Sequence, residues 1–127
     1  MTTFTLVLLF QFATQQFNLP PGLLSALCYV ESTHNVSAIH ADDGSSDSLG
    51  ICQVKIETAR WLGFQGTERD LMQPKVNIWY AAKFLSYQIN RYNDIERGVV
   101  AYNRGNAKGL TSSAYSAKVM KQWGYLQ

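Results

Sequence analysis

A chain of 127 residues with eleven Lys and Arg against nine Asp and Glu has the length of one domain and is nearly neutral. We therefore expect residues 1–127 to form a single domain with its own core. The net charge of +2 is too small and too dispersed for the basic stripe of a nucleic-acid-binding protein. Aromatic residues make up 13% of the chain, which is enough to leave some rings to line a groove.

The first predicted element is an apolar helix near the N-terminus. The run Leu6–Phe10 is too short to span a bilayer, so no membrane span is expected. No Lys or Arg precedes it and no small-residue cleavage site follows cleanly, so we read no clear signal peptide. Together with Phe4, Phe12 and Phe17, the run predicts a helix that is buried on much of its surface.

The second predicted helix covers about residues 20–33 and ends at an acidic residue. Asn18 is suited to cap it, and the two prolines that follow are tolerated in a first helical turn. Leu24, Cys28 and Glu31 form one row on this helix, so Glu31 shares a flank with apolar side chains.

The two cysteines do not have the spacing of metal ligands. Cys28 and Cys52 could pair only if the second helix and the following loop meet, and we expect two buried thiols instead.

The rest of the chain predicts one long loop and several helices. Residues 34–54 have no helical period and form a long loop or a short hairpin, which in a compact domain is usually functional. Helices are predicted over residues 56–62 and 67–72, from Pro74 onward, from a cap at Asp94 to a stop at Gly105, and from Ser112 or Ser113. The one that starts at Pro74 is apolar on two sides and should be central. The predicted fold class is all-α, with at most a short hairpin.

Polar side chains gather at three places beside helix ends: Glu31-Ser32, the loop Ser45–Gln53 and the segment Ala101–Gly105. An acid that protonates an ether-like bond must keep its proton near neutral pH, so apolar surroundings must raise its pKa. Glu31 meets this need. The alternative is a solvated carboxylate in the last helical turn, although a negative charge there opposes the helix dipole.

Other polar residues could complete such a site. The Tyr102 hydroxyl can hydrogen-bond a carboxyl group, and the Asn103 amide can donate to and accept from a sugar. Core packing of Tyr102 beside a solvated Asn103 is the alternative. Gly50 supplies backbone freedom, and Gln53 supplies an amide beside it.

In this order and at this spacing, the residues resemble the lytic transglycosylase catalytic domain of glycoside hydrolase family 23, related to goose-type lysozyme. The resemblance covers about residues 14–124. The matching residues are Leu23–Ser32 for a Leu-rich helix ending in Glu-Ser, Ala38, Gly50–Gln53 with Thr58-Ala59, Pro74–Ile78 with Phe84-Leu85, Ala101–Gly105 for Ala-Tyr-Asn-x-Gly, and Tyr115 with Val119.

The resemblance implies a lysozyme-like fold that cleaves the β-1,4 bond between N-acetylmuramic acid and N-acetylglucosamine in peptidoglycan. It also implies that Glu31 acts as acid and then base, without a second carboxylate, and that the product carries a 1,6-anhydromuramic acid end. The implied residues that support the acid or bind the substrate are Ser32, Gln53, Tyr102, Asn103 and Tyr115, and the loop residues Ser46 and Ser48 are further candidates for substrate binding.

The chain departs from the family at two positions. His40 stands where many members have Ser, and Cys52 stands where many have Met before the Gln. The first departure leaves open which hydroxyl contacts the substrate, with Ser46 and Ser48 as candidates.

Two rival functions remain at this point. A hydrolytic muramidase would use Asp42, Asp43 or Asp47 to position a water, although loop aspartates are more often turn residues. A non-catalytic cell-wall-binding module of a phage tail or secretion apparatus would keep the fold without the acid.

The partners follow from the same resemblance. They are peptidoglycan glycan strands, with no nucleic acid and no metal or organic cofactor. We expect a monomer, free or as part of a phage or secretion assembly. It would act in the periplasm or cell wall after delivery by a phage or export by dedicated machinery.

Overall fold

The computed structural model describes residues 1–42 and 44–125. Its elements in chain order are α1 (Thr3–Gln16), α2 (Leu23–Ser32), β1 (Ile39–His40), β2 (Ser48–Leu49), β3 (Val54–Lys55), α3 (Ile56–Trp61), α4 (Glu68–Leu71), α5 (Pro74–Tyr92), α6 (Ile95–Arg104) and α7 (Ala114–Tyr125). The predicted all-α class with a short hairpin is confirmed. No helix within the described residues has both the length and the apolar character needed to cross a membrane.

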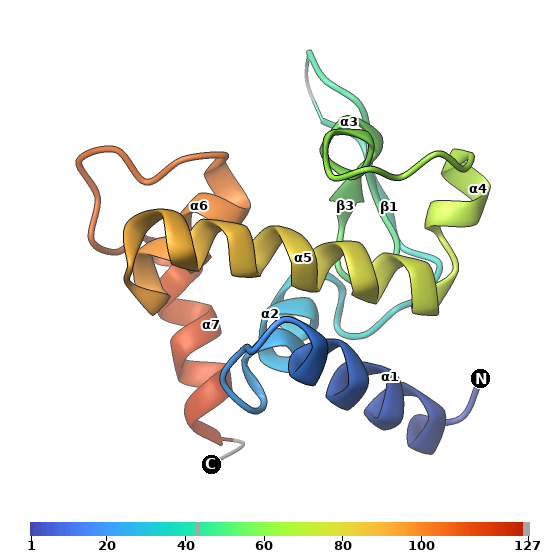
Figure 1. The fold of residues 1–127 in the computed structure, drawn as a ribbon, viewed down its shortest axis with the longest axis horizontal. Helices are drawn as coiled ribbons and strands as arrows, with labels where there is room; N and C mark the ends of the chain where they lie inside the picture. Colours follow the sequence, from blue (N-terminus) through green and yellow to red (C-terminus); the bar gives the residue numbers. More distant parts are fainter. Residues whose placement is uncertain (43, 126–127) are drawn as a thin grey trace.

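Helix α5 runs through the middle of the molecule (Figure 1). It packs against α6 and α1, while α7 packs against α2 and α6. Four of its apolar side chains are fully or almost fully buried, namely Ile78, Ala81, Ala82 and Leu85. The prediction that the helix starting at Pro74 is the central one is therefore correct.

Most predicted helix ends are found where local sequence signals place them. Thr67 caps α4, Asp94 caps α6 by accepting a bond from the Arg97 N–H, and Gly105 ends α6 in the left-handed region. Ser113 accepts a hydrogen bond of 3.0 Å from the N–H of Ser116 at the start of α7.

The three strands form a small antiparallel sheet in the order β1-β2-β3. His40 pairs with Ser48, and Ser48 pairs with Lys55. Side chains paired in this way lie next to one another on one face of a sheet. The register thus forms a short row of three polar residues.

A buried asparagine fastens the hairpin to α5. The Asn77 amide nitrogen donates to the carbonyls of Leu49, at 2.8 Å, and Leu71, at 2.9 Å, and its oxygen accepts from the Cys52 N–H at 2.9 Å. Gly50 lies against this amide with φ +80°, and a Cβ there would come within 2.5 Å of the Asn77 nitrogen. Glycine is therefore required where the hairpin meets α5.

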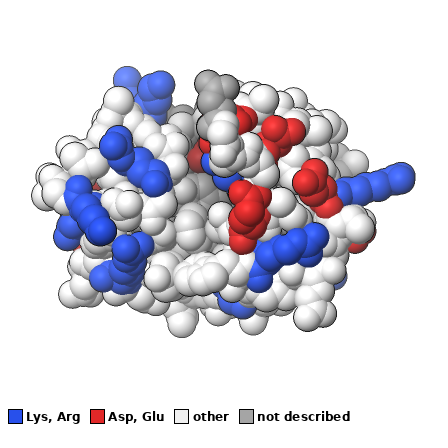
Figure 2. Space-filling model, turned by 90° about the horizontal axis from the view of Figure 1, so that it is seen from above, with Lys and Arg blue, Asp and Glu red and all other residues white. Residues whose placement is uncertain are grey.

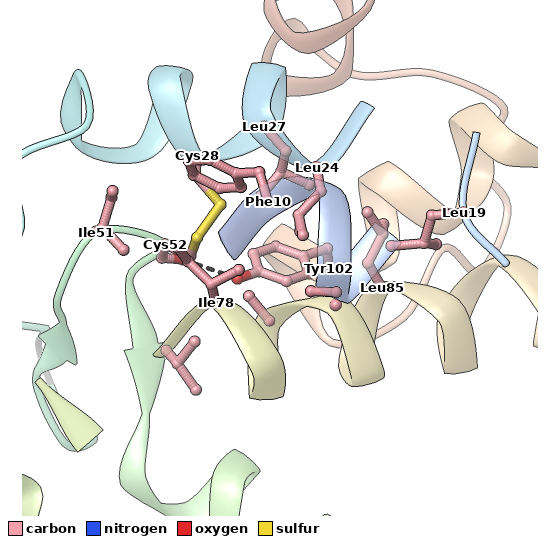
Figure 3. Close-up of a cluster of buried hydrophobic side chains, with 14 of the residues drawn as sticks. Phe10, Leu19, Leu24, Leu27, Cys28, Ile51, Cys52, Ile78, Leu85 and Tyr102 are labelled. Atoms are coloured by element: carbon pink, nitrogen blue, oxygen red, sulfur yellow. Dashed lines mark hydrogen bonds between the residues drawn. A yellow bond between two sulfur atoms is a disulfide. The ribbon is translucent and has the colours of Figure 1, made fainter. Parts of the chain in front are cut away.

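The expectation of two buried thiols is wrong, because Cys28 and Cys52 form a disulfide (Figure 3). Their Cα atoms are 4.4 Å apart, and both residues are fully buried. The end of α2 and the turn after β2 pack together, which the spacing of the cysteines in the sequence does not indicate.

The N-terminal helix is less buried than predicted. Only Phe10 and Ala13 of α1 are buried, while Phe4 is 71% exposed and Phe12 is 49% exposed. Helix α1 lies at the edge of the molecule (Figure 1) and packs mainly against α5.

The start of the second helix also differs from the prediction. Helix α2 begins at Leu23 after Gly22, and Asn18 does not cap it. Asn18 lies in the turn that ends α1, where it has φ 53° and its N–H donates to the Gln15 carbonyl. The two prolines form the connecting turn between the helices.

Candidate active site

A cavity of about 280 Å³ lies between the hairpin and the end of α6. Figure 2 shows the corresponding face of the molecule, which is hollowed near its centre. The residues that line the cavity are Glu31, Ser48, Gln53, Val54, Lys55, Thr58, Phe84, Tyr102, Asn103, Arg104 and Gly105. The cavity thus joins the three segments that the sequence singles out.

Glu31 lies at the C-terminal end of α2, in the cavity lining and largely out of solvent. The Tyr115 hydroxyl of α7 donates a hydrogen bond of 2.6 Å to Glu31 Oε2. Burial raises the pKa of Glu31 to about 7, and the Tyr115 hydrogen bond and the charge of His40 offset part of this rise. A substantial fraction of Glu31 therefore holds a proton at neutral pH, as a general acid must.

Tyr115, and not Tyr102, makes the hydroxyl-to-carboxyl contact. The Tyr102 hydroxyl donates to the Cys52 carbonyl at 2.7 Å (Figure 3), and its ring packs on Phe84. Burial raises the pKa of both tyrosines well above the usual range, so each stays a neutral donor. Tyr102 thereby ties α6 to the turn that follows β2.

Gln53 lines the cavity, but its amide is used within the hairpin. Its nitrogen donates to the carbonyls of Ala38, at 3.2 Å, and Gly50, at 2.9 Å. Its oxygen therefore faces His40, whose Nδ1 lies 2.6 Å away and must be the donor. Gln53 thus fixes both the hairpin and the tautomer of His40.

Two of the predicted substrate-binding serines lie outside the cavity lining. The Ser32 hydroxyl donates to the Ile51 carbonyl at 2.7 Å and accepts from the Asn35 N–H at 3.0 Å, so it joins the end of α2 to the hairpin turn. The Ser46 hydroxyl donates to the Glu57 carboxylate. Ser48 and Asn103, by contrast, both line the cavity.

Several cavity residues were not predicted from the sequence. Lys55 enters because it pairs with Ser48 across the sheet, and Thr58 because α3 starts directly after β3. Phe84 belongs to an apolar row of α5, which gave no sign of a cavity. Arg104 occupies the variable position of the Ala-Tyr-Asn-x-Gly pattern. Its neighbours in this pattern were predicted site residues, so the pattern could have indicated that Arg104 lies beside the cavity.

No cluster suited to a metal ion is found among residues 1–42 and 44–125. Glu31 with its raised pKa and the hydrogen-bonding side chains beside it are the groups that this cavity offers for chemistry.

The transglycosylase SLT domain family matches residues 8–122 of this chain. The chain belongs to this family. The resemblance predicted from the sequence is confirmed, and with it a mostly helical, lysozyme-like domain.

Of two similar proteins, one is from a bacterium and one is from a phage. Protein IpgF of Shigella flexneri is 30% identical over 97 residues, which cover 75% of this chain and 64% of that protein. The transglycosylase of Enterobacteria phage PRD1 is 29% identical over 112 residues, which cover 86% of this chain and 39% of that protein. The chain thus spans less than two thirds of the length of these relatives. No solved structure matches the chain.

Proposed function

We propose that this chain cleaves the β-1,4 bond between N-acetylmuramic acid and N-acetylglucosamine in peptidoglycan without water. The product would carry a 1,6-anhydromuramic acid end, and Glu31 would be the single catalytic carboxyl group. Membership of the SLT domain family supports the substrate, and the surroundings of Glu31 support the chemistry.

In the first step, Glu31 gives its proton to the oxygen of the glycosidic bond. Because the Tyr115 O–H occupies Oε2, Oε1 is the atom that carries this proton toward the cleft. The bond from C1 to that oxygen breaks, and the carbonyl oxygen of the neighbouring N-acetyl group bonds to C1. The cationic ring that forms is held opposite the carboxylate of Glu31.

In the second step, the Glu31 carboxylate takes the proton of the C6 hydroxyl. The C6 oxygen bonds to C1 as the bond from the acetyl oxygen breaks, which closes the anhydro ring and returns Glu31 to its acid form. Substrate assistance of this kind is a recognised exception to the use of two carboxylates. A pKa near neutrality suits a group that first donates and then accepts a proton.

The observation that carries this proposal is that Glu31 is the one carboxyl group lining the cavity among the described residues. Asp42 pairs with Lys55 and accepts from Ser45. Asp47 is exposed and lies outside the cavity lining. Asp43 lies outside the described residues. A hydrolase would need one of these groups to position a water beside the sugar.

Replacement of the acid is the first test. We expect Glu31→Gln to lower the rate of wall cleavage by about 10²–10⁴-fold, because general acid–base catalysis contributes this much. Asp47→Asn is the matched control, since it removes a loop carboxylate outside the cavity, and it should keep full activity. Retained activity in Glu31→Gln would overturn the assignment, and loss of activity in Asp47→Asn would favour the hydrolase.

The products decide between the two reactions. Mass spectrometry of digested peptidoglycan should find muramic acid ends that are lighter by one water than hydrolysed ends. Reducing muramic acid ends in their place would sink the transglycosylase proposal. A cell-wall-binding module without activity would release neither product.

We assign the predicted substrate-binding residues two kinds of role. Four of them would contact the glycan from the cavity lining, namely Ser48, Gln53, Tyr102 and Asn103. Ser48 would supply the hydroxyl that many family members supply from the position where this chain has His40. The other three would act indirectly, through the groups that they hydrogen-bond. Tyr115 would position Glu31, Ser32 the hairpin turn, and Ser46 the Glu57 carboxylate.

The setting of the activity is proposed on the relatives. The likeness to a phage transglycosylase supports action in the periplasm or cell wall after delivery in a phage particle. Export by a secretion machinery is the alternative. We propose that the domain works as a monomer, and sedimentation of the purified chain tests this.

A further inference from the structure

The two walls of the cavity differ in charge. Residues 31–70, which include the hairpin, contain seven Asp and Glu against three Lys and Arg. Residues 91–125, which include α6 and α7, contain six Lys and Arg against two Asp and Glu. In Figure 2, one side of the central hollow carries mainly Lys and Arg, whereas most Asp and Glu lie on the other side, together with further Lys and Arg. A ligand in the cavity thus meets positive charge on the α6 side.

Two cations line the cavity, and they differ in how they are used. Lys55 pairs with Asp42 and donates to the Ser45 hydroxyl at 2.8 Å, so its charge is neutralised within the hairpin. Arg104 is exposed, and its side chain makes no ion pair or hydrogen bond with any of the described residues. Its planar group of five N–H donors is therefore available to a ligand.

The backbone beneath Arg104 is held in place. The Gly105 N–H donates to the Ala101 carbonyl at 2.7 Å and ends α6. The Gly105 carbonyl accepts from Gln88 and Arg91, each at 3.2 Å. The exposed side chain thus extends from a fixed point at the rim of the cavity, which reduces the entropy cost of binding.

A guanidinium group with free donors matches a carboxylate, which it binds through two parallel hydrogen bonds. The sugar rings of peptidoglycan carry hydroxyl and acetamido groups, and the lactyl carboxyl of muramic acid is bound as an amide to a short peptide. The carboxylates of the intact polymer therefore lie on its peptide branches.

We propose that Arg104 binds a carboxylate of the peptide branch and makes the enzyme select peptide-bearing glycan over bare glycan. This inference rests on the proposed function, because it assumes a glycan strand in the same cavity. It adds a specificity-determining residue that takes no part in the proton transfers at Glu31.

The test compares one glycan in two chemical forms: peptidoglycan fragments with free peptide carboxylates, and the same fragments with those carboxylates converted to amides. We expect amidation to lower the kcat/KM of the unchanged protein about tenfold, mainly through KM. Arg104→Gln should lower kcat/KM on the free-acid fragments by about the same factor. In this variant, amidation of the fragments should cause no further loss. Lys108→Gln removes an exposed charge of the same wall outside the cavity lining, and it should behave as the unchanged protein.

The outcomes are distinguishable from failure of the proposed function. If the chain cleaves both substrates and Arg104→Gln still prefers the free acid, the inference on Arg104 is wrong while the cleavage reaction stands. A muramic acid polymer with free lactyl carboxylates and no peptide is the third substrate. If the protein cleaved this polymer as well as the free-acid fragments, the carboxylate bound by Arg104 would belong to the sugar. That result would overturn the peptide-branch proposal.

Binding gives a readout that does not depend on cleavage. In the Glu31→Gln background, calorimetry should find about tenfold tighter binding of the free-acid fragment than of the amidated one. This difference should vanish in the Glu31→Gln, Arg104→Gln double variant. Equal affinities in the Glu31→Gln protein would contradict the inference even if no substrate were cleaved.

Discussion

The two walls of the cavity are built in different ways. The hairpin wall, residues 38–42 and 44–58, contains three strands of only two residues each, so it has few backbone hydrogen bonds of its own. It is held by the side chains of Asn77 and Gln53 and by the disulfide. The helix wall, residues 95–110, contains α6 with its own backbone bonds, and only the loop after it needs side-chain support. Loss of a single side chain should therefore damage the hairpin wall more than the helix wall.

The largest expected effect on stability is at Asn77. Asn77→Ala leaves three buried backbone groups without partners, and we expect it to lower the free energy of unfolding by about 4 kcal/mol. Denaturant unfolding measures this, with Asn90→Ala on the exposed side of the same helix as the control. A loss no larger than that of the control would mean that the hairpin wall does not depend on this amide.

The disulfide is the second support of the hairpin wall. Replacing both Cys28 and Cys52 by Ala should lower the free energy of unfolding by about 3 kcal/mol, because the bridge restricts the unfolded chain. Reductant should lower the unfolding midpoint of the unchanged protein, whereas the unfolding midpoint of the double variant should not change. Equal midpoints for the two proteins without reductant would contradict the role given to the bridge.

Glu31 lies between the walls and links stability to pH. Its pKa is raised from 4.5 to about 7, so the folded state binds more protons than the unfolded state between these values, and stability falls as pH rises through this range. Glu31→Gln removes the cost of ionising a buried carboxyl. The variant should match the unchanged protein near about pH 4 and exceed it by about 2 to 3 kcal/mol near about pH 8.

Thermal melting at both pH values measures this effect. Asp47→Asn, which alters an exposed loop acid, serves as the control. If Glu31→Gln gave the same stability difference at both pH values, burial of Glu31 would not be the source of its raised pKa.

The smallest effect is expected in the helix wall. Arg97 donates to the Leu110 carbonyl at 2.9 Å and the Ala107 carbonyl at 3.0 Å, and it lies over the ring of Tyr92. Arg97→Ala should cost about 1 to 2 kcal/mol, because Tyr92 still binds the Ala107 N–H. Denaturant unfolding with Lys118→Ala as the control measures it. A loss as large as that of Asn77→Ala would remove the contrast between the walls.

Much of the fold could be predicted because its signals are local. The cap at Asp94 and the stop at Gly105 act on backbone groups within one helical turn. The apolar rows of α5 indicate a central helix because side chains three and four apart share a face. The same rule identified the apolar flank of Glu31, although a raised pKa also requires the burial that only the packed helices provide.

The prediction for α1 failed because hydrophobicity alone does not specify which side of a helix is covered. Phe4 and Phe12 are as apolar as Phe10, yet only Phe10 faces the core. Asn18 failed as a cap for a similar reason, since the path of the chain between α1 and α2 places the helix start beyond it.

The sequence by itself determined the helical class, the family and the candidate acid Glu31, because these depend on residue types and on spacings of a few residues. Tertiary structure alone decided which groups surround that acid. Tyr115 reaches it from 84 residues away, Tyr102 bonds to Cys52 from 50 residues away, and Cys28 joins Cys52 across the base of the hairpin. Contacts between such distant positions depend on how the helices pack, and no local pattern in the chain specifies them.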